Sequence, residues 1–287
     1  MTAITLEKPA ALASLLRNYS AEVTTHEPVS IESAGKLLPR GSEVFIAALT
    51  KDDAVRHVAA ATRLRRDGLE PIPHIVARNI RTEADMDDLL SRLAGEAGVT
   101  KAMVLGGDRD KPAGCFLSSL ALIETGYFQK HGIRSIFIGC YPEGHPRISE
   151  QTLDEARAQK IAAAEKAGLS VVLVSQFCFS AEPIVALARR MRALGVTAPF
   201  RVGVAGPADP ATLVKYAVVC GIGASLRALK ERQGQVKSLM AGETPEAVLS
   251  GVAEARAADP SLGISGVHFF TFGSLARTIE WARIHSR

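Results

Sequence analysis

Eight short runs rich in apolar residues recur along the chain, and each is followed by a segment that carries helix signals. Most of these runs are almost continuously apolar, as expected for parallel strands that are covered on both faces. A chain that alternates strand and helix in this way forms either a closed (βα)8 barrel or an open doubly wound sheet. The predicted strands are residues 21–25, 43–48, 72–77, 102–105, 135–140, 170–176, 201–204 and 266–270.

The number of strands and the chain length favour the barrel. The 287 residues are close to the length of about 250 residues that is typical of a (βα)8 barrel. A G-x-G-x-x-G fingerprint does not follow the first strand, and its nearest match, residues 221–226, lacks the third glycine and follows a helical stretch. We therefore predict an α/β fold, a single (βα)8 TIM-barrel domain over residues 1–287, with a mobile loop at 234–242.

Residues with capping preferences mark the ends of the predicted helices. Thr82 followed by Asp85 is typical of a helix N-terminus with an acidic first turn, and Gly95 suits the end of that helix. Thr152 and Glu155 have the spacing of a capping box, and Gly168 suits the end of the helix that they begin. These signals lie between predicted strands, so they support the alternation of strand and helix.

Composition excludes several classes of protein. Hydrophobic residues make up 47% of the chain and charged residues 22%, which provides enough apolar material for a large core. No apolar run approaches the ~20 residues that a membrane-spanning helix needs, and residues 1–18 lack the apolar stretch of a secretory signal. We therefore expect a cytoplasmic protein with no membrane partner.

Charge and cysteine usage narrow the classes of ligand. The net charge of +4 is spread along the chain, which argues against a nucleic-acid partner and weakly favours a small anionic ligand. The cysteines form no C-x-x-C pair, which argues against a zinc site or a redox dithiol. We expect no metal and four buried free thiols, at Cys115, Cys140, Cys178 and Cys220.

Polar residues lie in or just beyond several predicted strands. In a (βα)8 barrel the chemistry lies at the C-terminal face, so such residues are expected to meet at one mouth. Each has a structural alternative, because a carboxylate inside a barrel can be an ion-pair partner and a loop histidine is often only solvated. The residues are Glu22, Gly107, Asp108, Tyr141, His145, Gln176 and Tyr216.

Five segments in the same order resemble motifs of the methylenetetrahydrofolate reductase family, and the resemblance covers nearly the whole chain. The matches at residues 141–146 and 176–179 are the most specific of the five. The segments are Pro73-His74 for a P-H-L/I strand, Leu105-Gly106-Gly107-Asp108 for L-R-G-D, residues 141–146 (YPEGHP) for Y-P-E-x-H-P, residues 174–179 (VSQFCF) for I-T-Q-F-F-F, and residues 267–272 (VHFFTF) for F-H-F-Y-T-L.

The resemblance implies an FAD-dependent oxidoreductase of one-carbon metabolism and methionine biosynthesis. It implies that hydride from NAD(P)H reduces 5,10-methylenetetrahydrofolate to 5-methyltetrahydrofolate. A helix N-terminus and a lysine suit the pyrophosphate of FAD, because both stabilise negative charge. The positions that match FAD contacts of the family are His74, Gly107, Asp108, Tyr141, His145, Asp154 and Lys160.

The resemblance also implies roles at the folate. Glu22 matches the general acid, and a buried carboxylic acid can donate the proton that opening of the methylenetetrahydrofolate ring requires. Asp108 matches a carboxylate that stabilises cationic character on the substrate. Gln176 matches a pterin contact, Tyr216 an aromatic face for nicotinamide or folate, and Thr212 a substrate-binding glutamine.

The sequence departs from the family pattern at several positions. The F-F-P-P run after the first strand is replaced by residues 23–28 (VTTHEP), and the arginine of L-R-G-D is Gly106. Gly273-Ser274 stands where the family has Asn-Arg. A bidentate arginine grip on a carboxylate contributes roughly 1.5–3 kcal/mol. We therefore expect the folate tail to be held weakly or by different residues.

These departures leave two other functions open. One is a flavin oxidoreductase on the same barrel that acts on another amine or pterin. The other is a non-catalytic accessory subunit that binds flavin or folate, although a protein that only binds has no need of an acid at Glu22. The choice between NADH and NADPH, the direction of the reaction and assembly as a homo-oligomer are open as well.

Overall fold

The computed structural model describes residues 8–49, 53–222 and 245–287. Its eight strands are joined in sequence order into a closed barrel, and the pairs β1 with β8, β2 with β3, β3 with β4, β4 with β5 and β7 with β8 are parallel. This confirms the predicted (βα)8 fold, and every predicted strand is present with its ends within two residues. The strands are β1 (Tyr19–Thr24), β2 (Glu43–Ala47), β3 (Glu70–Val76), β4 (Lys101–Leu105), β5 (Ser135–Cys140), β6 (Ser170–Ser175), β7 (Phe200–Ala205) and β8 (Ile264–Phe270).

Helices alternate with the strands through the described part of the chain. Short 3-10 turns lie at η1 (Ala77–Asn79) and η2 (Pro260–Leu262). The α-helices are α1 (Lys8–Leu16), α2 (Pro28–Leu37), α3 (Ala54–Arg66), α4 (Glu83–Ala97), α5 (Ser119–Glu124), α6 (Tyr127–Lys130), α7 (Glu150–Lys166), α8 (Ala181–Ala193), α9 (Pro210–Val219), α12 (Glu246–Ala258) and α13 (Leu275–His285).

Helix caps agree with the sequence signals at some ends and differ at others. The Thr82 side chain accepts a hydrogen bond from the Asp85 N–H at 3.0 Å, as predicted for the start of α4. The prediction that Gly95 ends α4 was wrong, because the helix continues to Ala97 and ends at Gly98, whose left-handed backbone (φ 57°) favours glycine. The capping box at Thr152 was also wrong, because α7 begins two residues earlier, at Glu150.

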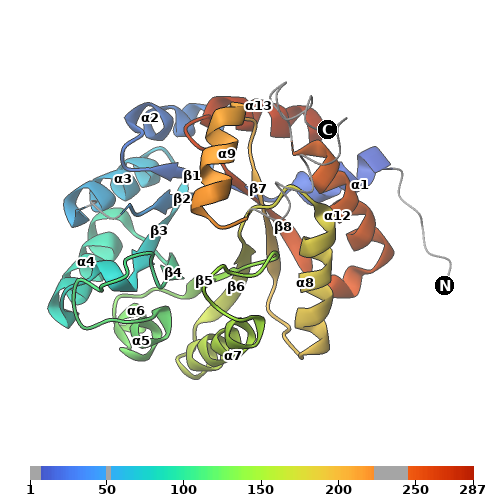
Figure 1. Ribbon diagram of the computed structural model, residues 1–287. Helices are drawn as coiled ribbons and strands as arrows, with labels where there is room; N and C mark the ends of the chain where they lie inside the picture. Colours follow the sequence, from blue (N-terminus) through green and yellow to red (C-terminus); the bar gives the residue numbers. More distant parts are fainter. Residues whose placement is uncertain (1–7, 50–52, 223–244) are drawn as a thin grey trace. The chain divides into compact units, whose positions relative to one another are not determined.

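The contacts divide the chain into two compact units, and each is described by itself. The first unit comprises Met1–Ala21, Cys140–Glu150 and Val174–Arg287, and the second comprises Glu22–Gly139 and Gln151–Leu173. In the second unit, α3 and α4 pack together on the outer side of β2, β3 and β4 (Figure 1). Leu64 of α3 and Leu90 of α4 are fully buried, and each such side chain stabilises the fold by roughly 1.5–3 kcal/mol.

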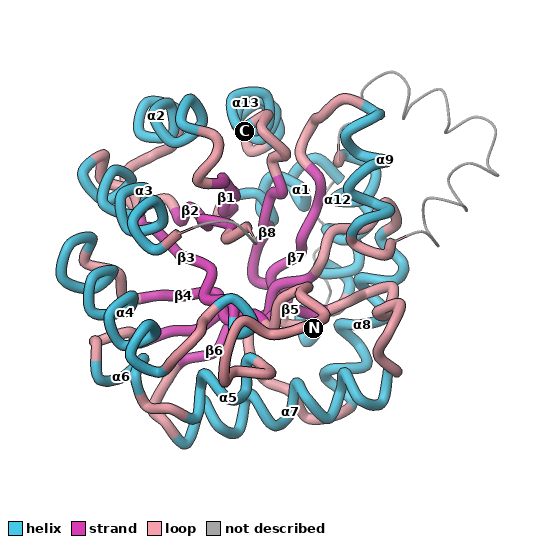
Figure 2. Tube along the Cα trace, turned by 60° about the vertical axis from the view of Figure 1, so that its left-hand side comes forward, coloured by secondary structure: helices cyan, strands magenta, loops and turns pink. Residues whose placement is uncertain are grey.

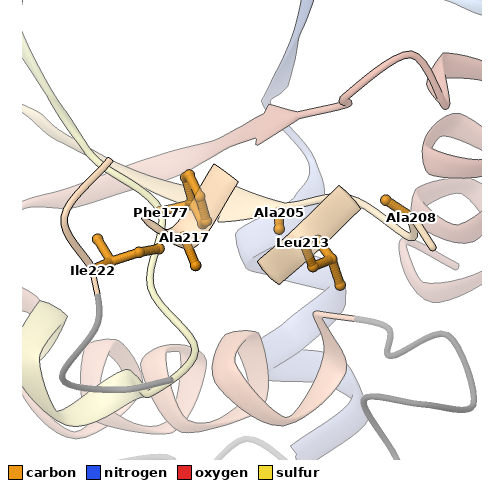
Figure 3. Packing of buried hydrophobic residues seen from close by; sticks show 6 residues of the cluster. All are labelled: Phe177, Ala205, Ala208, Leu213, Ala217 and Ile222. Carbon is orange, nitrogen blue, oxygen red and sulfur yellow. The ribbon is translucent and has the colours of Figure 1, made fainter. Parts of the chain in front are cut away.

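In the first unit, β7 and β8 lie side by side over their whole length (Figure 2). Helix α1 packs against α12, α13 and β8. A cluster of buried side chains joins the residues that follow β6, the end of β7 and the residues after it to helix α9 and Ile222 beyond it, and Figure 3 shows its members. They are Phe177, Ala205, Ala208, Leu213, Ala217 and Ile222, and we call this set the Phe177 cluster.

The prediction of four buried thiols was correct for two of the four cysteines. All four cysteines are free, but only Cys140 and Cys178 are buried, and Cys115 is exposed. In the described ranges no helix is long and apolar enough to cross a membrane, and no group of three or more metal-ligating side chains occurs. The predicted loop at 234–242 lies outside the described residues, as does most of the segment 221–226.

Candidate functional site

Glu22 and His74 form an acid and imidazole pair in the second unit. Glu22 lies near the C-terminal end of β1, and His74 lies two residues before the end of β3. The Glu22 Oε2 atom is 3.4 Å from His74 Nε2, and the two side chains are only 16% and 10% exposed. The Phe45 ring packs edge-on against the His74 imidazole with 6.2 Å between centroids. The structure therefore brings two of the predicted site residues together in a largely dry environment.

Burial raises the pKa of the Glu22 carboxyl above its ordinary value, and the positive charge of nearby His74 opposes part of that rise. The direction of this pKa shift distinguishes a structural ion-pair partner from a proton donor. A structural ion-pair partner has its carboxylate form stabilised, whereas Glu22 has its protonated form stabilised because desolvation is the larger effect. Glu22 is thus suited to hold a proton and to give it up to a base.

Residues 23–28, where the sequence departs from the family pattern, add a second carboxyl. Glu27 begins α2 as its N-cap residue, and its N–H donates to the Thr24 carbonyl at 3.1 Å. Burial raises the pKa of the Glu27 carboxyl, hydrogen bonds from Thr24 and Ser30 oppose the rise, and the Glu22 carboxylate adds to it. Glu27 was not among the residues predicted from the sequence, because residues 23–28 were compared only with the F-F-P-P run that they replace.

The loop after β4 holds Gly107 and Asp108, also in the second unit. Gly107 has a left-handed backbone (φ 99°), and a Cβ atom there would lie 2.6 Å from Val76 Cγ1, so the position requires glycine. Asp108 is exposed next to it. Arg78 ties this loop down, because its N–H donates to the Gly106 carbonyl at 3.0 Å and its Nη1 donates to the Arg109 carbonyl at 2.9 Å. Sequence reasoning missed this arginine.

A cavity of about 410 Å³ opens at the C-terminal ends of β2 and β3 in the second unit. Ligand pockets in proteins typically have volumes of ≈ 300–1,000 Å³, so this one can accept a ring system of moderate size. His74 and Val76 form part of its wall, together with Ala48, Leu49 and Asn79. Of the predicted cofactor residues, His74 therefore lines a cavity of suitable size.

Two further predicted cofactor residues, Asp154 and Lys160, lie on α7 in the second unit. Asp154 forms an ion pair with Arg157, whose side chain is buried. Both Asp154 and Lys160 are half-buried. The Asp154 carboxylate is therefore held in place by a cation that sequence reasoning missed, although arginine three residues along a helix from aspartate is a recognisable ion-pair spacing.

Tyr141 and His145 lie together in a turn after β5, in the first unit. The ring centroids are 5.3 Å apart and the rings are nearly perpendicular, at 81°. Gly144, with φ 75°, closes the turn by donating its N–H to the Tyr141 carbonyl at 3.1 Å. His145 Nδ1 accepts a hydrogen bond from the Arg147 N–H at 3.2 Å. The Y-P-E-x-H-P segment thus folds into a compact turn that orients both rings.

Gln176 follows β6 in the first unit and is half-buried. Its N–H donates to the Cys140 carbonyl at 2.7 Å, which joins it to the end of β5. Its side-chain Oε1 accepts a hydrogen bond from the Phe177 N–H at 3.1 Å. The side chain is therefore oriented by its own backbone, with the amide nitrogen as the end that can donate to a ligand.

Thr212 and Tyr216 lie on α9, also in the first unit. Thr212 donates its hydroxyl and its N–H to Asp209, the N-cap residue of α9, so its side chain is occupied by helix capping. Tyr216 is half-buried, and its ring stacks on Phe272 with 4.4 Å between centroids and 19° between planes. Sequence reasoning missed Phe272, which stands where the family pattern has leucine.

The predicted site residues are divided between the two units. Within each unit the structure pairs some of them directly, Glu22 with His74 and Tyr141 with His145. The second unit holds Glu22, His74, Gly107, Asp108, Asp154 and Lys160, and the first holds Tyr141, His145, Gln176, Thr212 and Tyr216. That all of them meet at one mouth stays a prediction.

No model of a known protein family matches the chain. Among solved structures, it resembles an uncharacterized protein from Clostridium thermocellum that binds two copies of 5-methyl-5,6,7,8-tetrahydrofolic acid. That likeness has 13% identity and a TM-score of 0.57, and it covers 96% of this chain and 99% of that one. A putative phosphonomutase from Burkholderia cenocepacia matches at 12% identity and a TM-score of 0.54, over 96% of both chains.

Dihydropteroate synthase from Thermus thermophilus matches at 17% identity and a TM-score of 0.48, over 94% of both chains. At identities this low a structural likeness establishes the fold and not the chemistry. The chain therefore belongs among the (βα)8 barrels, and its function has to be argued from its own residues.

Proposed function

We propose that the protein is a flavin-dependent oxidoreductase that interconverts 5,10-methylenetetrahydrofolate and 5-methyltetrahydrofolate, with NAD(P)H as hydride donor and FAD as cofactor. The observation that carries the proposal is Glu22, a desolvated carboxyl at the C-terminal end of a barrel strand, with a raised pKa and an imidazole 3.4 Å away. This reaction requires one acid that is still protonated near neutral pH.

The role of Glu22 follows from the bonds that change. Reduction breaks the bond between the methylene carbon and N10 of the folate, and the departing nitrogen takes up a proton while the carbon accepts a hydride. Glu22 supplies that proton and is left as a carboxylate beside His74. The imidazole then stabilises the new negative charge in its protonated form and returns Glu22 to the acid form when solvent protonates the pair.

The second unit has features that fit a flavin. When bound, FAD would supply the ring that carries hydride from the nicotinamide to the substrate. The cavity beside β2 and β3 is large enough for a ring system, and His74 forms part of its wall. Gly107 keeps the chain close to Val76, and the exposed carboxylate of Asp108 follows it. These residues are assigned to cofactor binding, with Asp108 stabilising positive charge on the substrate.

The folate assignment has separate support. Gln176, held by its own backbone, can donate its amide to the pterin, and Tyr216 offers an aromatic face. The Clostridium thermocellum protein is a case in which a fold of this kind binds 5-methyl-5,6,7,8-tetrahydrofolic acid. Three positions do not supply the folate contacts that the resemblance implies. Gly273 and Ser274 stand in place of asparagine and arginine, and the Thr212 hydroxyl donates its hydrogen bond to Asp209.

These departures favour, as a second candidate, a flavin oxidoreductase on the same barrel that acts on another amine or pterin. The two candidates share the cofactor and the acid and differ only in the substrate. A substrate panel therefore separates them.

The first test is the absorbance spectrum of the purified protein, followed by identification of any ligand released by heat. We expect flavin bands and FAD, because Asp154 and Lys160 match positions at the pyrophosphate end of that cofactor. Anaerobic NADH and NADPH should bleach the bands, and methylenetetrahydrofolate should restore them. FMN as the sole ligand contradicts the cofactor assignment, and a protein that cannot be reconstituted with any flavin contradicts the function. Bleaching without reoxidation by the folate supports the second candidate.

A further inference from the structure

Phe272 has a backbone conformation that is unusual for its residue type. In the part of the chain that the structure describes, it is the only residue other than glycine with a positive φ, at 48°. A side chain with a Cβ atom is unfavourable in this left-handed region, and bulky aromatic residues rarely occupy it. Gly273, with φ 80°, follows directly, so the chain turns sharply after β8. A strained residue kept at the end of a barrel strand calls for an explanation.

The conformation places the Phe272 ring against Tyr216 of α9. The two rings are nearly parallel, at 19°, with 4.4 Å between centroids. Phe272 also lies edge-on against Phe177, at 5.2 Å and 72°, so it rests on the Phe177 cluster shown in Figure 3. One face of the Tyr216 ring is therefore held against a second ring that the Phe177 cluster supports.

The surroundings of this pair also indicate what it can bind. Both rings are half-buried, so aromatic surface is left at the edge of the cluster. Lys215 places its Nζ atom 5.7 Å from the Tyr216 ring centroid. A planar ring that carries an anionic tail suits this arrangement, since the aromatic faces contact the ring and the ammonium attracts the tail.

We propose that Phe272 is a positioning residue that fixes the Tyr216 ring as a stacking face for the substrate. The proposal rests on the proposed function for the identity of the ligand, a reduced folate whose pterin or aminobenzoyl ring stacks on Tyr216. In this proposal, stacking on Tyr216 supplies binding free energy that Gly273 and Ser274 cannot supply through polar contacts. Phe272 itself acts through Tyr216, and its strained backbone is the condition for the stack.

The test is a double-mutant cycle on the complete protein with its cofactor bound. The Kd for 5-methyltetrahydrofolate is measured by calorimetry for wild type, Phe272→Leu, Tyr216→Leu and the double variant. An aromatic stack of this kind corresponds to roughly a 2- to 12-fold change in Kd. We expect Phe272→Leu to weaken binding by that amount, Phe272→Tyr to restore it, and Phe272→Leu to have no further effect once Tyr216 is leucine.

A matched control and a backbone control accompany the cycle. Tyr19→Leu removes another ring of the first unit, which packs edge-on against Phe269 at 5.6 Å, and should leave the Kd unchanged. Phe272→Gly removes the ring and also relieves the left-handed strain, so it should fold even if the leucine variant does not. It should weaken binding as Phe272→Leu does. Unchanged binding by both Phe272 variants would overturn the proposal.

A measurement on the ligand-free protein tests the positioning role of Phe272 independently of the proposed function. The chain has four tyrosines, so NMR with labelled tyrosine can assign Tyr216 by substitution. The Tyr216 ring resonances should move when Phe272 is changed to leucine and not when Tyr19 is. If wild type binds no folate while this shift is present, the function fails and the positioning role stands. If the Tyr216 resonances do not move, or if the two Kd effects add, the positioning role is refuted whatever the substrate.

Discussion

The Glu22–His74 pair of the second unit and the end of β8 in the first unit relate to the family pattern in opposite ways. At the pair, both residues match the pattern, and burial gives the carboxyl the raised pKa that an acid needs. After β8, Gly273 and Ser274 stand where the pattern has asparagine and arginine, and Phe272, which precedes them in the chain, has a positive φ. The first region has the groups of the pattern, and the second lacks them and has the Tyr216–Phe272 stack beside it.

The difference shows which parts of such a site can be exchanged. A general acid contributes roughly 10²–10⁴ to the rate, and only a group with a transferable proton at the reacting atom can supply it. Binding of a flexible, charged tail contributes roughly 1.5–3 kcal/mol and can be moved to other contacts of similar strength. We therefore expect substitutions at Glu22 to have far larger effects than substitutions around Ser274.

The largest effect should come from Glu22→Gln. This change keeps the size and the hydrogen bonding of the side chain but removes the proton that it donates. Bleaching of the flavin by NAD(P)H should persist, while reoxidation by methylenetetrahydrofolate should slow by roughly 10²–10⁴-fold. Stopped-flow absorbance measures the two half-reactions separately.

The matched control is Glu43→Gln on β2, which removes another barrel carboxylate. Glu43 is paired with Lys101 at 2.7 Å, so its loss should lower stability and leave both half-reactions intact. A Glu22→Gln variant that reoxidises at the wild-type rate would remove the acid assignment. Equal slowing of both half-reactions would instead assign Glu22 a structural role.

The fold could be predicted from the sequence because its main signals are local. Buried parallel strands are continuous apolar runs, and all eight were found with their ends within two residues. Helix ends were less certain, because capping residues also occur inside helices. Gly95 lies three residues before the glycine that ends α4, and only the left-handed backbone of Gly98 separates the two.

The site was predicted less completely, because much of it depends on contacts between distant residues. Glu22 and His74 were predicted from the resemblance. Their contact with each other and the raised pKa of Glu22 depend on the folded structure, which no motif shows. Thr212 was assigned to substrate by alignment, and the hydrogen bond from its hydroxyl to Asp209, the N-cap residue of α9, was not foreseen. Phe272 lay in the motif match at 267–272 but was given no role, since a positive φ at a phenylalanine has no sequence signal.

A second prediction concerns how stability depends on pH at the Glu22–His74 pair. The folded-state pKa of Glu22 is raised above the ordinary 4.5, so the folded protein holds this proton more tightly than the unfolded chain does. The free energy of unfolding should therefore lose this contribution as pH rises from the ordinary pKa to the raised one, and stay level above that window. Glu22→Gln lacks the titration and should gain stability relative to wild type over the same window.

Denaturant unfolding of the two proteins across this pH range measures the difference. Glu27→Gln is the companion variant, because burial also raises the pKa of Glu27 and the two carboxyls repel each other. It should show the same sign of pH dependence. A difference between wild type and Glu22→Gln that does not change with pH would mean that Glu22 ionises normally, which would remove the basis for its role as an acid.

The smallest expected effects lie at the end of β8, where the comparison between the two regions can be tested directly. Ser274→Arg introduces the arginine of the family pattern at the N-cap position of α13. It should lower the KM for methylenetetrahydrofolate by roughly 2- to 5-fold, with kcat nearly unchanged, because a new ion pair near solvent contributes less than a bidentate grip. Ser286→Arg adds the same charge at the other end of α13 and should have no effect. If Ser274→Arg is also without effect, Lys215 is the candidate that already holds the tail. Lys215→Gln should then raise the KM by about 2- to 3-fold and reduce its dependence on salt, because an exposed ammonium acts mainly through screened attraction.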